Sequence, residues 1–421
     1  MIDAIKNLNG IISLILTAVY LYQIIFMVVG WVNRKKKFAE VEAPFHRFAV
    51  LISARNEEEV IADLVKSLRK QKYPQNMYDV FVLADNCTDN TAKNAREAGA
   101  IVYERWNSQL VGKGYALDFL IKEIKKDYKK YDGYMVFDAD NVVDENFIFE
   151  MNKTFDKGYD AITSYRNSKN FGTNWISAAY SIWFLREARF LNYPRMLLNT
   201  NCAISGTGFC ISDKIVEENG GWPFHLLTED IQFSVNCAVA GKKIGYCDKA
   251  MVYDEQPITF AQSWTQRLRW SKGFYQVNAK YSGALIKGSI VNKGSRFSCY
   301  DMFMTTMPGM ILTLVVILFN VAMMFVASTE PYYIANVVFK ICGKFIIDTL
   351  LAFYVGFLIY GAITVISEWN MINAPTAKKI KYVFSFPVFQ ATYIPVSVVA
   401  LIKKVEWKPI KHFSADTYAV R

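Results

Sequence analysis

Long runs of apolar residues stand near both ends of the 421-residue chain, and most of the charged residues lie between them. The first run, residues 11–32, has about 22 positions without a charge, enough to cross a bilayer core of about 30 Å. A basic cluster, Arg34-Lys35-Lys36-Lys37, follows directly. Basic residues favour the cytoplasmic side, so residues 1–37 are expected to be a transmembrane anchor and its flank, with the next domain in the cytoplasm. A signal peptide fits less well, because the basic cluster follows the apolar run instead of preceding it.

The C-terminal part is again lipid-like, and residues 284–421 are expected to form interfacial and transmembrane helices with a short tail. Three apolar stretches lie there: residues 303–327, the run that ends near Ile366, and residues 382–402. Three crossings would place Lys403 and Lys404 outside, against the positive-inside rule. Either one run does not cross or the tail is an exception, and the sequence leaves both open. In either case a multi-pass protein of the cell membrane is expected.

Between these segments, in residues 38–283, short apolar runs alternate with stretches of helical periodicity. The expected strands are Phe48–Ile52, Val80–Leu83, Ile101–Tyr103 and Tyr134–Phe137, and the helices between them end near Arg69, Ala98 and Tyr128. Repeated βα units with short connections predict a parallel α/β sheet with right-handed crossovers. Ligands of such sheets bind at the carboxyl ends of the strands. Asp85, Lys113, Asp138 and Asp140 are expected to meet at that edge.

The strand Tyr134–Phe137 ends in two carboxylates one residue apart, Asp138 and Asp140. Alternation along an extended chain would point both side chains the same way. Hard oxygen ligands in this position suit Mg²⁺ or Mn²⁺, which in turn can hold a diphosphate. The same pattern also occurs at ordinary corners between a strand and a turn.

Two further motifs contain residues that could bind a ligand or take part in a reaction. The glycines of Ser205-Gly206-Thr207-Gly208 suit either a close approach to a ligand or a plain turn. In Thr228-Glu229-Asp230, Thr228 is a plausible helix cap and the two acids lie in the first turn, so capping alone explains them. A carboxylate at this point is also what a general base requires.

A third motif, Gln266-Arg267-Leu268-Arg269-Trp270, falls in a helical stretch. Gln266, Arg269 and Trp270 are spaced i, i+3, i+4 and share one face. An amide, a guanidinium and an indole together can grip a diphosphate and stack on a sugar. An interfacial helix with a snorkelling arginine and an anchoring tryptophan is the alternative. The upstream aromatics Trp175, Tyr180, Trp183 and Phe184 are interpreted as core or interface packing before sugar stacking.

Composition excludes several other classes of protein. The net charge of +10 comes largely from basic residues beside apolar segments, which indicates a membrane surface; no aromatic-basic motif points to nucleic acid. Seven cysteines, an odd number without a Cys-x-x-Cys pair, favour reduced thiols over a disulfide framework or a zinc site. With three histidines in all, a metal site built on histidine is not expected.

Asp85, the Asp138-Ala139-Asp140 motif, Thr228-Glu229-Asp230 and the Gln-x-x-Arg-Trp motif occur in this order before the membrane helices. Together they resemble the family 2 membrane glycosyltransferases, and more narrowly the processive synthases of cellulose, chitin, hyaluronan and poly-N-acetylglucosamine. The resemblance spans about residues 47–270. It implies a GT-A (Rossmann-like) cytosolic glycosyltransferase domain embedded between transmembrane α-helices. The second strand departs from the family, since Ala84-Asp85-Asn86-Cys87 replaces the common Asp-Asp-Gly or Asn-Asp-Gly form.

The resemblance also implies roles for individual residues. Asp230, with Glu229 beside it, would be the catalytic base that deprotonates the acceptor hydroxyl. Asp140 would hold the metal on the diphosphate. The remaining expected substrate-binding residues are Ala54, Arg55, Glu57, Asp85, Lys113, Asp138, Gly206, Gln266, Arg269 and Trp270.

The expected reaction is a direct displacement at the anomeric carbon of a UDP-sugar, which turns an α-linked donor into a β-linked product. The expected cofactor is Mg²⁺ or Mn²⁺. The expected partners are the UDP-sugar donor, a growing glycan acceptor, membrane lipids and possible accessory export subunits, without nucleic acid. The favoured product is a polysaccharide such as a cellulose-like β-glucan or poly-N-acetylglucosamine, made processively and translocated across the membrane as an exopolysaccharide. A non-processive transferase that adds one sugar to a polyprenyl phosphate or another lipid is the alternative.

Overall fold

The computed structural model describes residues 2–36, 42–127, 130–406 and 412; Lys37, the start of the expected domain at residue 38 and most of the C-terminal tail lie outside this range. The described strands are β1 (Phe48–Ala54), β2 (Tyr78–Asp85), β3 (Ile101–Arg105), β4 (Gly133–Asp138), β5 (Val142–Val143), β6 (Ala161–Ser168), β7 (Phe209–Ser212) and β8 (Ile244–Asp254).

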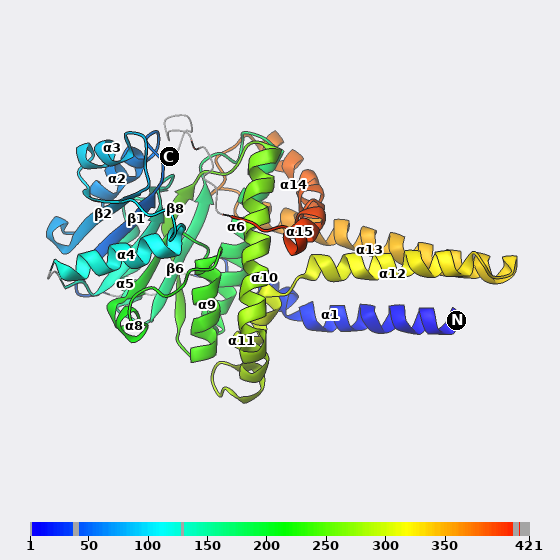
Figure 1. Cartoon of the computed structure of the whole chain (residues 1–421). Coiled ribbons are helices and arrows are strands. Elements are labelled where there is room, and N and C mark those ends of the chain that lie inside the picture. The colour runs from blue at the N-terminus through cyan, green and yellow to red at the C-terminus, as the bar shows by residue number, and fades with distance from the viewer. Residues whose placement is uncertain (1, 37–41, 128–129, 407–411, 413–421) are drawn as a thin grey trace.

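The helices that belong with this sheet in residues 48–306 are drawn in Figure 1. They are α2 (Ile61–Arg69), α3 (Thr91–Glu97), α4 (Lys113–Lys126), α5 (Phe147–Phe155), α6 (Trp175–Glu187), α7 (Tyr193–Leu197), α8 (Asp213–Glu218), α9 (Glu229–Ala240), α10 (Phe260–Val291) and α11 (Arg296–Thr306). Short segments are 3₁₀-helical at Gln75–Met77 and π-helical at Ala188–Asn192. The apolar helices are α1 (Ile2–Val32), α12 (Gly309–Ala327), α13 (Tyr332–Ser367), α14 (Thr376–Ala391) and α15 (Tyr393–Ile402).

The strands form one mixed sheet in the order β3-β2-β1-β4-β7-β6-β8-β5. The first four strands in that order are parallel, as the βα pattern predicts. The whole sheet is mixed, because β7 runs antiparallel to both β4 and β6, and β5 runs antiparallel to β8. These pairings join segments distant in the sequence, so no local pattern marks their direction. The register pairs Ser53 with Asp138 and Ala54 with Ala84, which brings the ends of β1, β2 and β4 to the same edge.

Successive residues of β1 face two separate apolar layers. Phe48, Val50 and Ile52 pack with α2 and α5, whereas Ala49 and Leu51 pack with α4 on the opposite face. All five are fully buried. A sheet covered by helices on both faces explains why the sequence shows continuous apolar runs instead of alternation.

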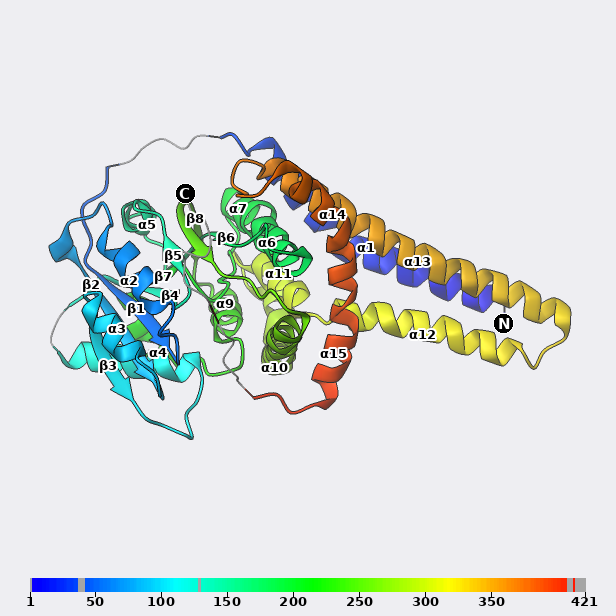
Figure 2. The same ribbon diagram turned by 90° about the horizontal axis from the view of Figure 1, so that it is seen from above.

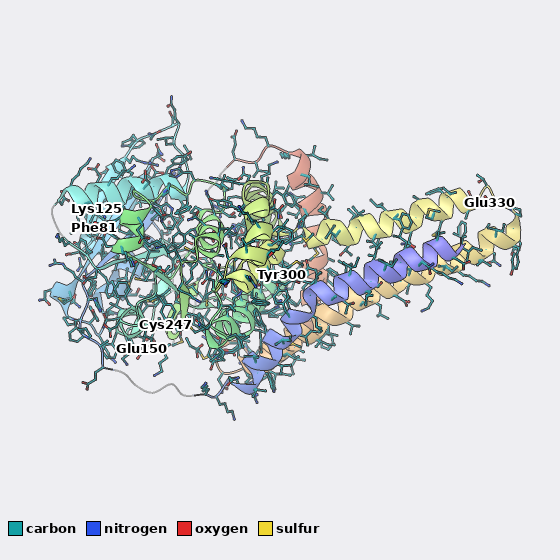
Figure 3. The ribbon with its side chains drawn as sticks, turned by 90° about the horizontal axis from the view of Figure 1, so that it is seen from below. Phe81, Lys125, Glu150, Cys247, Tyr300 and Glu330 are labelled. Atoms are coloured by element: carbon teal, nitrogen blue, oxygen red, sulfur yellow. The ribbon has the colours of Figure 1, made fainter. Side chains whose placement is uncertain are left out.

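Three of the apolar helices, α1, α12 and α13, project together from one end of the molecule (Figures 1 and 2). Figure 3 places Glu330, in the turn between α12 and α13, at the end remote from Phe81 and Lys125 of the sheet domain. Each helix is long and apolar enough to cross a membrane, and only 11–17% of its most apolar 18-residue stretch is buried. Inside this group Asn9 of α1 and Asn320 of α12 exchange amide hydrogen bonds of 2.8 and 3.1 Å. The expected span 303–327 is interrupted at Met307 and Pro308, where α11 gives way to α12.

The last apolar run behaves differently. It forms two helices, α14 and α15, which run across the base of the projecting group and stay against the sheet domain (Figure 2). The Thr392 hydroxyl accepts a 2.6 Å bond from Arg267 of α10. Lys272 and Tyr275 of α10 donate to the carbonyls of Ala400 (3.0 Å) and Ser397 (3.1 Å). These hydrogen bonds hold α15 against α10.

Candidate active site

A cavity of about 240 Å³ opens at the carboxyl edge of the sheet and extends to α6 and α10. All thirteen residues singled out from the sequence line it: Ala54, Arg55, Glu57, Asp85, Lys113, Asp138, Asp140, Gly206, Glu229, Asp230, Gln266, Arg269 and Trp270. They come from segments more than 200 residues apart in the chain. The fold therefore brings into one place what the sequence shows only as separate motifs.

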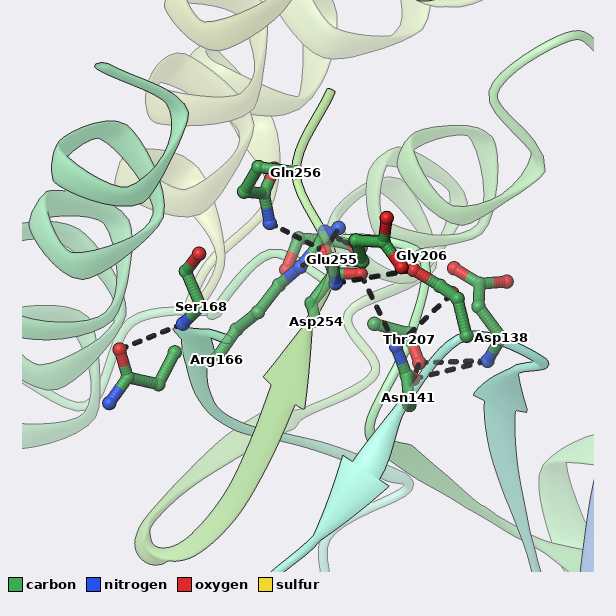
Figure 4. Close-up of polar contacts among 12 residues, drawn as sticks. Asp138, Asn141, Arg166, Ser168, Gly206, Thr207, Asp254, Glu255 and Gln256 are labelled. Atoms are coloured by element: carbon green, nitrogen blue, oxygen red, sulfur yellow. Dashed lines mark hydrogen bonds and ion pairs between the residues drawn. The ribbon is translucent and has the colours of Figure 1, made fainter. Parts of the chain in front are cut away.

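Asp138 and Asp140 lie at the end of β4, in a turn that other segments hold in place (Figure 4). The Asp138 amide lies 3.0 Å from the Thr207 hydroxyl and 3.2 Å from the Asn141 side-chain oxygen, and it donates to both. Asp140 is 5% exposed and accepts a 3.3 Å bond from the Glu255 amide. The Asp-x-Asp turn is thus rigid and directed into the cavity.

Lys113, the first residue of α4, reaches across to this turn. Its ammonium group pairs with the Asp138 carboxylate and donates a 2.6 Å bond to the Gly206 carbonyl. Burial lowers the pKa of Lys113, but Asp138 and Glu229 outweigh that effect, so its pKa is raised and the side chain remains a cation. The site therefore keeps a fixed positive charge between the Asp-x-Asp turn and the glycine loop.

Glu229 and Asp230 occupy the first turn of α9. Burial raises the pKa of Glu229 to about 7, repulsion from Asp230 adds to this, and Lys113 opposes it. Burial also raises the pKa of Asp230. Thr228 is the N-cap residue, but the predicted capping bond is not formed: its hydroxyl is buried without a hydrogen-bond partner among the described residues. Capping therefore does not account for this motif.

Gly206 separates the glycine loop from Asp230. Its φ is +86°, and a Cβ added there would lie 3.4 Å from Asp230 Oδ2. A side chain would be strained by the backbone, while its Cβ would only touch the carboxylate. The glycine thus permits the close approach that the sequence suggested.

Gln266, Arg269 and Trp270 face the cavity from one side of α10. Arg267, between them, is fully buried on the other side, where it packs over Phe389 and Tyr393 of α14 and α15. Trp270 is held edge-on against Tyr180 and Phe184 at 5.7 and 6.1 Å between ring centres. The polar face of the motif belongs to the cavity, whereas Arg267 and Leu268 pack against the apolar helices.

Asp85 forms a buried ion pair that the sequence does not indicate. Its carboxylate accepts a 2.7 Å bond from Arg105 Nε, and both side chains are buried. Arg105 also donates to the carbonyls of Leu110 (3.0 Å) and Tyr115 (3.1 Å), which holds the loop before α4. Asp85 therefore lines the cavity as half of a buried ion pair.

Several lining residues were missed by the sequence reasoning. Arg166 of β6 pairs with Asp254 of β8 and donates a 2.6 Å bond to the Ser205 carbonyl (Figure 4). Burial raises the pKa of Asp254 to about 6, and Arg166 partly offsets this. The acidic pair Asp254-Glu255 after an apolar strand repeats the signal of Asp138 and Asp140, and would have marked this corner. Trp183, Phe184 and Glu187 of α6 also line the cavity, although the two aromatics were interpreted as packing.

His412 was also missed, because it lies 355 residues from its partner Glu57. Its Nδ1 is 3.0 Å from Glu57 Oε2, and its Nε2 is 3.9 Å from Asp140 Oδ2. Burial lowers the pKa of His412, but Asp140 and Glu57 outweigh that effect and raise it to about 10. A C-terminal residue thus returns to the Asp-x-Asp corner.

The donor set at this corner fits a divalent cation bound jointly with a ligand. Asp140, Asp254 and Glu255 gather negative charge there, and Asp140 is buried. Among the described residues no group of three His, Cys, Asp or Glu side chains forms a complete metal cage. Mg²⁺ commonly takes one or two carboxylates and completes its shell with phosphate oxygens and water. Asp140, with Asp138 beside it, is suited to that partial role.

Comparison with known proteins agrees with this geometry. Residues 46–273 match the model of a family described as glycosyltransferase-like family 2. A β-monoglucosyldiacylglycerol synthase from Nostoc sp. is 27% identical over 282 residues, covering 64% of this chain and 57% of the relative. A poly-β-1,6-N-acetyl-D-glucosamine synthase from Staphylococcus epidermidis is 26% identical over 282 residues, covering 61% and 65%. The chain therefore spans less than two thirds of the length of either relative.

Among solved structures, a mannosyltransferase from Pyrobaculum calidifontis in complex with GDP-Man and Mn²⁺ aligns with a TM-score of 0.52 and 13% identity. The alignment covers 96% of this chain and 99% of the mannosyltransferase, and at this identity it supports the fold alone. It confirms the expected GT-A type of α/β domain. Since the family match spans the sheet, the Asp-x-Asp turn, the acidic pair of α9 and the Gln-x-x-Arg-Trp face, the chain belongs to glycosyltransferase-like family 2.

Proposed function

We propose that the chain is an inverting hexosyltransferase that transfers a sugar from a UDP-sugar to a glycan hydroxyl and so extends a β-linked polysaccharide. One observation carries this proposal. Glu229 and Asp230 share a single cavity with Asp138 and Asp140, and Lys113 and Arg269 supply positive charge there. A nucleotide-sugar transferase needs these three elements: a base, a metal corner and cations for the leaving diphosphate.

The donor half is formed by the ends of β1, β2 and β4. Ala54, Arg55, Glu57 and Asp85 line the end of the cavity where ligands of α/β sheets bind, and are assigned to the uridine. Lys113 and Arg269 are assigned to the diphosphate; Arg269 makes no hydrogen bond or ion pair with the described residues, so its guanidinium is available. Asp140 is assigned to Mg²⁺ or Mn²⁺, which when bound neutralises charge on the diphosphate.

The acceptor half provides the proton transfer. Asp230 accepts the proton of the acceptor hydroxyl, the hydroxyl oxygen forms a bond to the anomeric carbon, and the bond from that carbon to the UDP oxygen breaks. Lys113 and Arg269 stabilise the negative charge that develops on the departing UDP. Attack from the face opposite the leaving group gives the β-linkage. Glu229 lies beside Asp230 in the first turn of α9 and lines the same end of the cavity.

The membrane arrangement is proposed from the path of the chain. The contact of His412 with Glu57 supports a cytoplasmic position for His412, on the same side of the membrane as the sheet domain. Crossing by α1, α12 and α13, with α14 and α15 lying in the membrane plane, gives an external N-terminus and a cytoplasmic tail. Lys403 and Lys404 are then inside, which removes the conflict with the positive-inside rule. A cysteine introduced at residue 2 should react with an impermeant maleimide in intact cells. A cysteine introduced at residue 404 should react only after the cells are opened.

A second candidate, transfer of one sugar to a membrane lipid, is favoured by a different observation. The projecting helices leave most of their side chains exposed, so three of them do not enclose a path for a polymer. One relative is by name a glucosyldiacylglycerol synthase. If the product is a polymer, export needs a second copy or an accessory subunit to complete the path.

The deciding experiment measures UDP release by the purified protein in detergent, across a panel of UDP-sugars with Mg²⁺ or Mn²⁺, and sizes the radiolabelled product. A high-mass polymer that a linkage-specific glycosidase digests supports the polysaccharide synthase and names its sugar. A low-mass product that appears only with added diacylglycerol or polyprenyl phosphate supports the lipid transferase. Absence of UDP-sugar binding would refute both.

A further inference from the structure

The outward face of α13 carries a stripe of polar residues that the proposed reaction does not use. Its members follow one another at intervals of four residues, so each neighbours the next on the helix surface. They are Asn336, Lys340, Lys344 and Asp348, and all four are exposed. Lys344 and Asp348 pair with each other at 2.8 Å, whereas Lys340 has no hydrogen bond or ion pair with any described residue. This polar stripe therefore has an excess of one positive charge.

The polar stripe lies at the depth that α12 covers. α12 is 19 residues long, about 28 Å, and its exposed residues, among them Val315 and Phe325, are all apolar. The chain reverses in residues 328–331, and Ala327 of α12 packs with Cys342 of α13. The first half of α13 thus runs beside α12 and shares its depth in the membrane.

Lys340 and Lys344 stand near the middle of that depth. Counted from Tyr332, at the start of α13, they are about 12 and 18 Å along the helix axis, within a hydrocarbon core of about 30 Å. A lysine near a helix end can extend its ammonium group to the headgroups. Lys344 instead turns toward Asp348, one helical turn further from Tyr332. Because charged groups at this depth normally face protein or water and not lipid tails, we expect the stripe to be covered.

The other two projecting helices show no such surface. α12 contains no charged residue, and those of α1 are Asp3 and Lys6, in its first two turns. The amides of Asn9 and Asn320 turn inward and bond to each other. The charged surface of the projecting helices at this depth is thus confined to one side of α13, which gives a partner a single face to occupy.

We propose that the polar stripe of α13 is the docking face for a transmembrane helix of another protein, and that this helix presents a carboxylate to Lys340. Charge complementarity selects this partner, because a carboxylate neutralises the excess positive charge of the stripe. A second copy of the chain, related by a two-fold axis along the membrane normal, would place Lys340 and Lys344 against their own counterparts, which repel. The proposal goes beyond the reaction and depends only on the crossing of the membrane by α13.

The test uses the full chain in the cells that naturally produce it, with the photoreactive residue p-benzoylphenylalanine in place of Ile347, an exposed position beside the stripe. Illumination should capture a membrane protein through an apolar segment that contains Asp or Glu, identified by mass spectrometry. The same replacement at Val315, on the exposed face of α12, should capture lipid alone.

Charge variants then test the contact itself. Lys340→Leu should reduce the captured fraction at least fivefold, whereas Lys340→Arg, which keeps the charge, should preserve it. Lys340→Glu should abolish capture, and replacing the partner's carboxylate by lysine should restore it. Lys6→Leu, at the exposed lysine in the second turn of α1, is the matched control and should leave capture unchanged.

Four results would overturn the docking face. One is capture of lipid alone at residue 347, which would leave Lys340 to a headgroup phosphate. The second is capture of another copy of this chain, and the third is capture that Lys340→Leu does not reduce. The fourth is reaction of Lys344→Cys with an impermeant maleimide in intact cells as fast as that of Glu330→Cys, since the stripe would then lie outside the membrane. UDP binding by the purified protein tests the proposed function separately from all four.

Discussion

Asp230→Asn tests the assignment of the base most directly, because the substitution keeps the size of the side chain and removes its ability to take a proton. A positioned general base contributes about 10²- to 10⁴-fold to the rate, or about 3–5 kcal/mol in the barrier. We expect kcat to fall by that factor. The fold should survive, since the site loses a buried charge whose ionised form is already disfavoured by burial.

Donor binding, unlike kcat, should not be weakened by Asp230→Asn. The charges of Lys113 and Arg269 act on Asp230, so an uncharged asparagine leaves both cations freer to attract a diphosphate. The Kd for the UDP-sugar should therefore stay the same or decrease. Loss of repulsion should also lower the pKa of Glu229 from about 7.

The assay separates the two quantities: isothermal titration with UDP and the UDP-sugar for binding, and single-turnover transfer for chemistry. Asp156→Asn, at a carboxylate bonded to His46 outside the cavity, is the matched control and should leave both unchanged. A parallel loss of donor binding and transfer in Asp230→Asn, or a transfer rate within threefold of the unmodified protein, would refute the assignment.

Further predictions concern the cation, the pH profile, the metal and stability. Lys113→Met should weaken UDP binding at least tenfold by leaving Asp138 unpaired beside the diphosphate, and unchanged UDP affinity in titration would contradict that role. Because burial raises the pKa of Asp230 and the base must be deprotonated, kcat should rise with pH over a range above the ordinary pKa of an aspartate; a rate that falls as Asp230 ionises would oppose the scheme. Chelation with EDTA should reduce UDP release at least tenfold, with recovery on adding Mn²⁺ or Mg²⁺, and undiminished release would argue against a metal. Arg195→Met strands the fully buried Asp301 and should cost about 3–5 kcal/mol of unfolding free energy, measured as a lower thermal midpoint, whereas replacing both residues by apolar ones should restore most of it.

The local pattern of the sequence was sufficient for much of the fold. Apolar runs ending in polar residues located β1, β2, β3 and β4 within a few residues. The signal is clearest for β1, β2 and β4, which are buried on both faces, whereas β3 is a partly exposed edge strand. The same logic placed Asp138 at the end of a strand. Spacing along a helix put Gln266, Arg269 and Trp270 on one face, since that geometry depends only on the helical repeat.

Only the tertiary structure decided how distant segments meet. The antiparallel direction of β7, the Arg105 bond to Asp85 and the Arg166 pair with Asp254 all join residues whose neighbours in sequence carry no sign of the partner. The same holds for His412, which reaches Glu57 from the far end of the chain. Hydropathy could not show that α14 and α15 lie across the base of the other helices, because a helix packed on a protein surface and a helix that crosses a bilayer can have similar composition. The sequence by itself determined the elements and the chemical groups, which follow from local burial and periodicity; their convergence on one cavity depended on long-range packing, which no local pattern encodes.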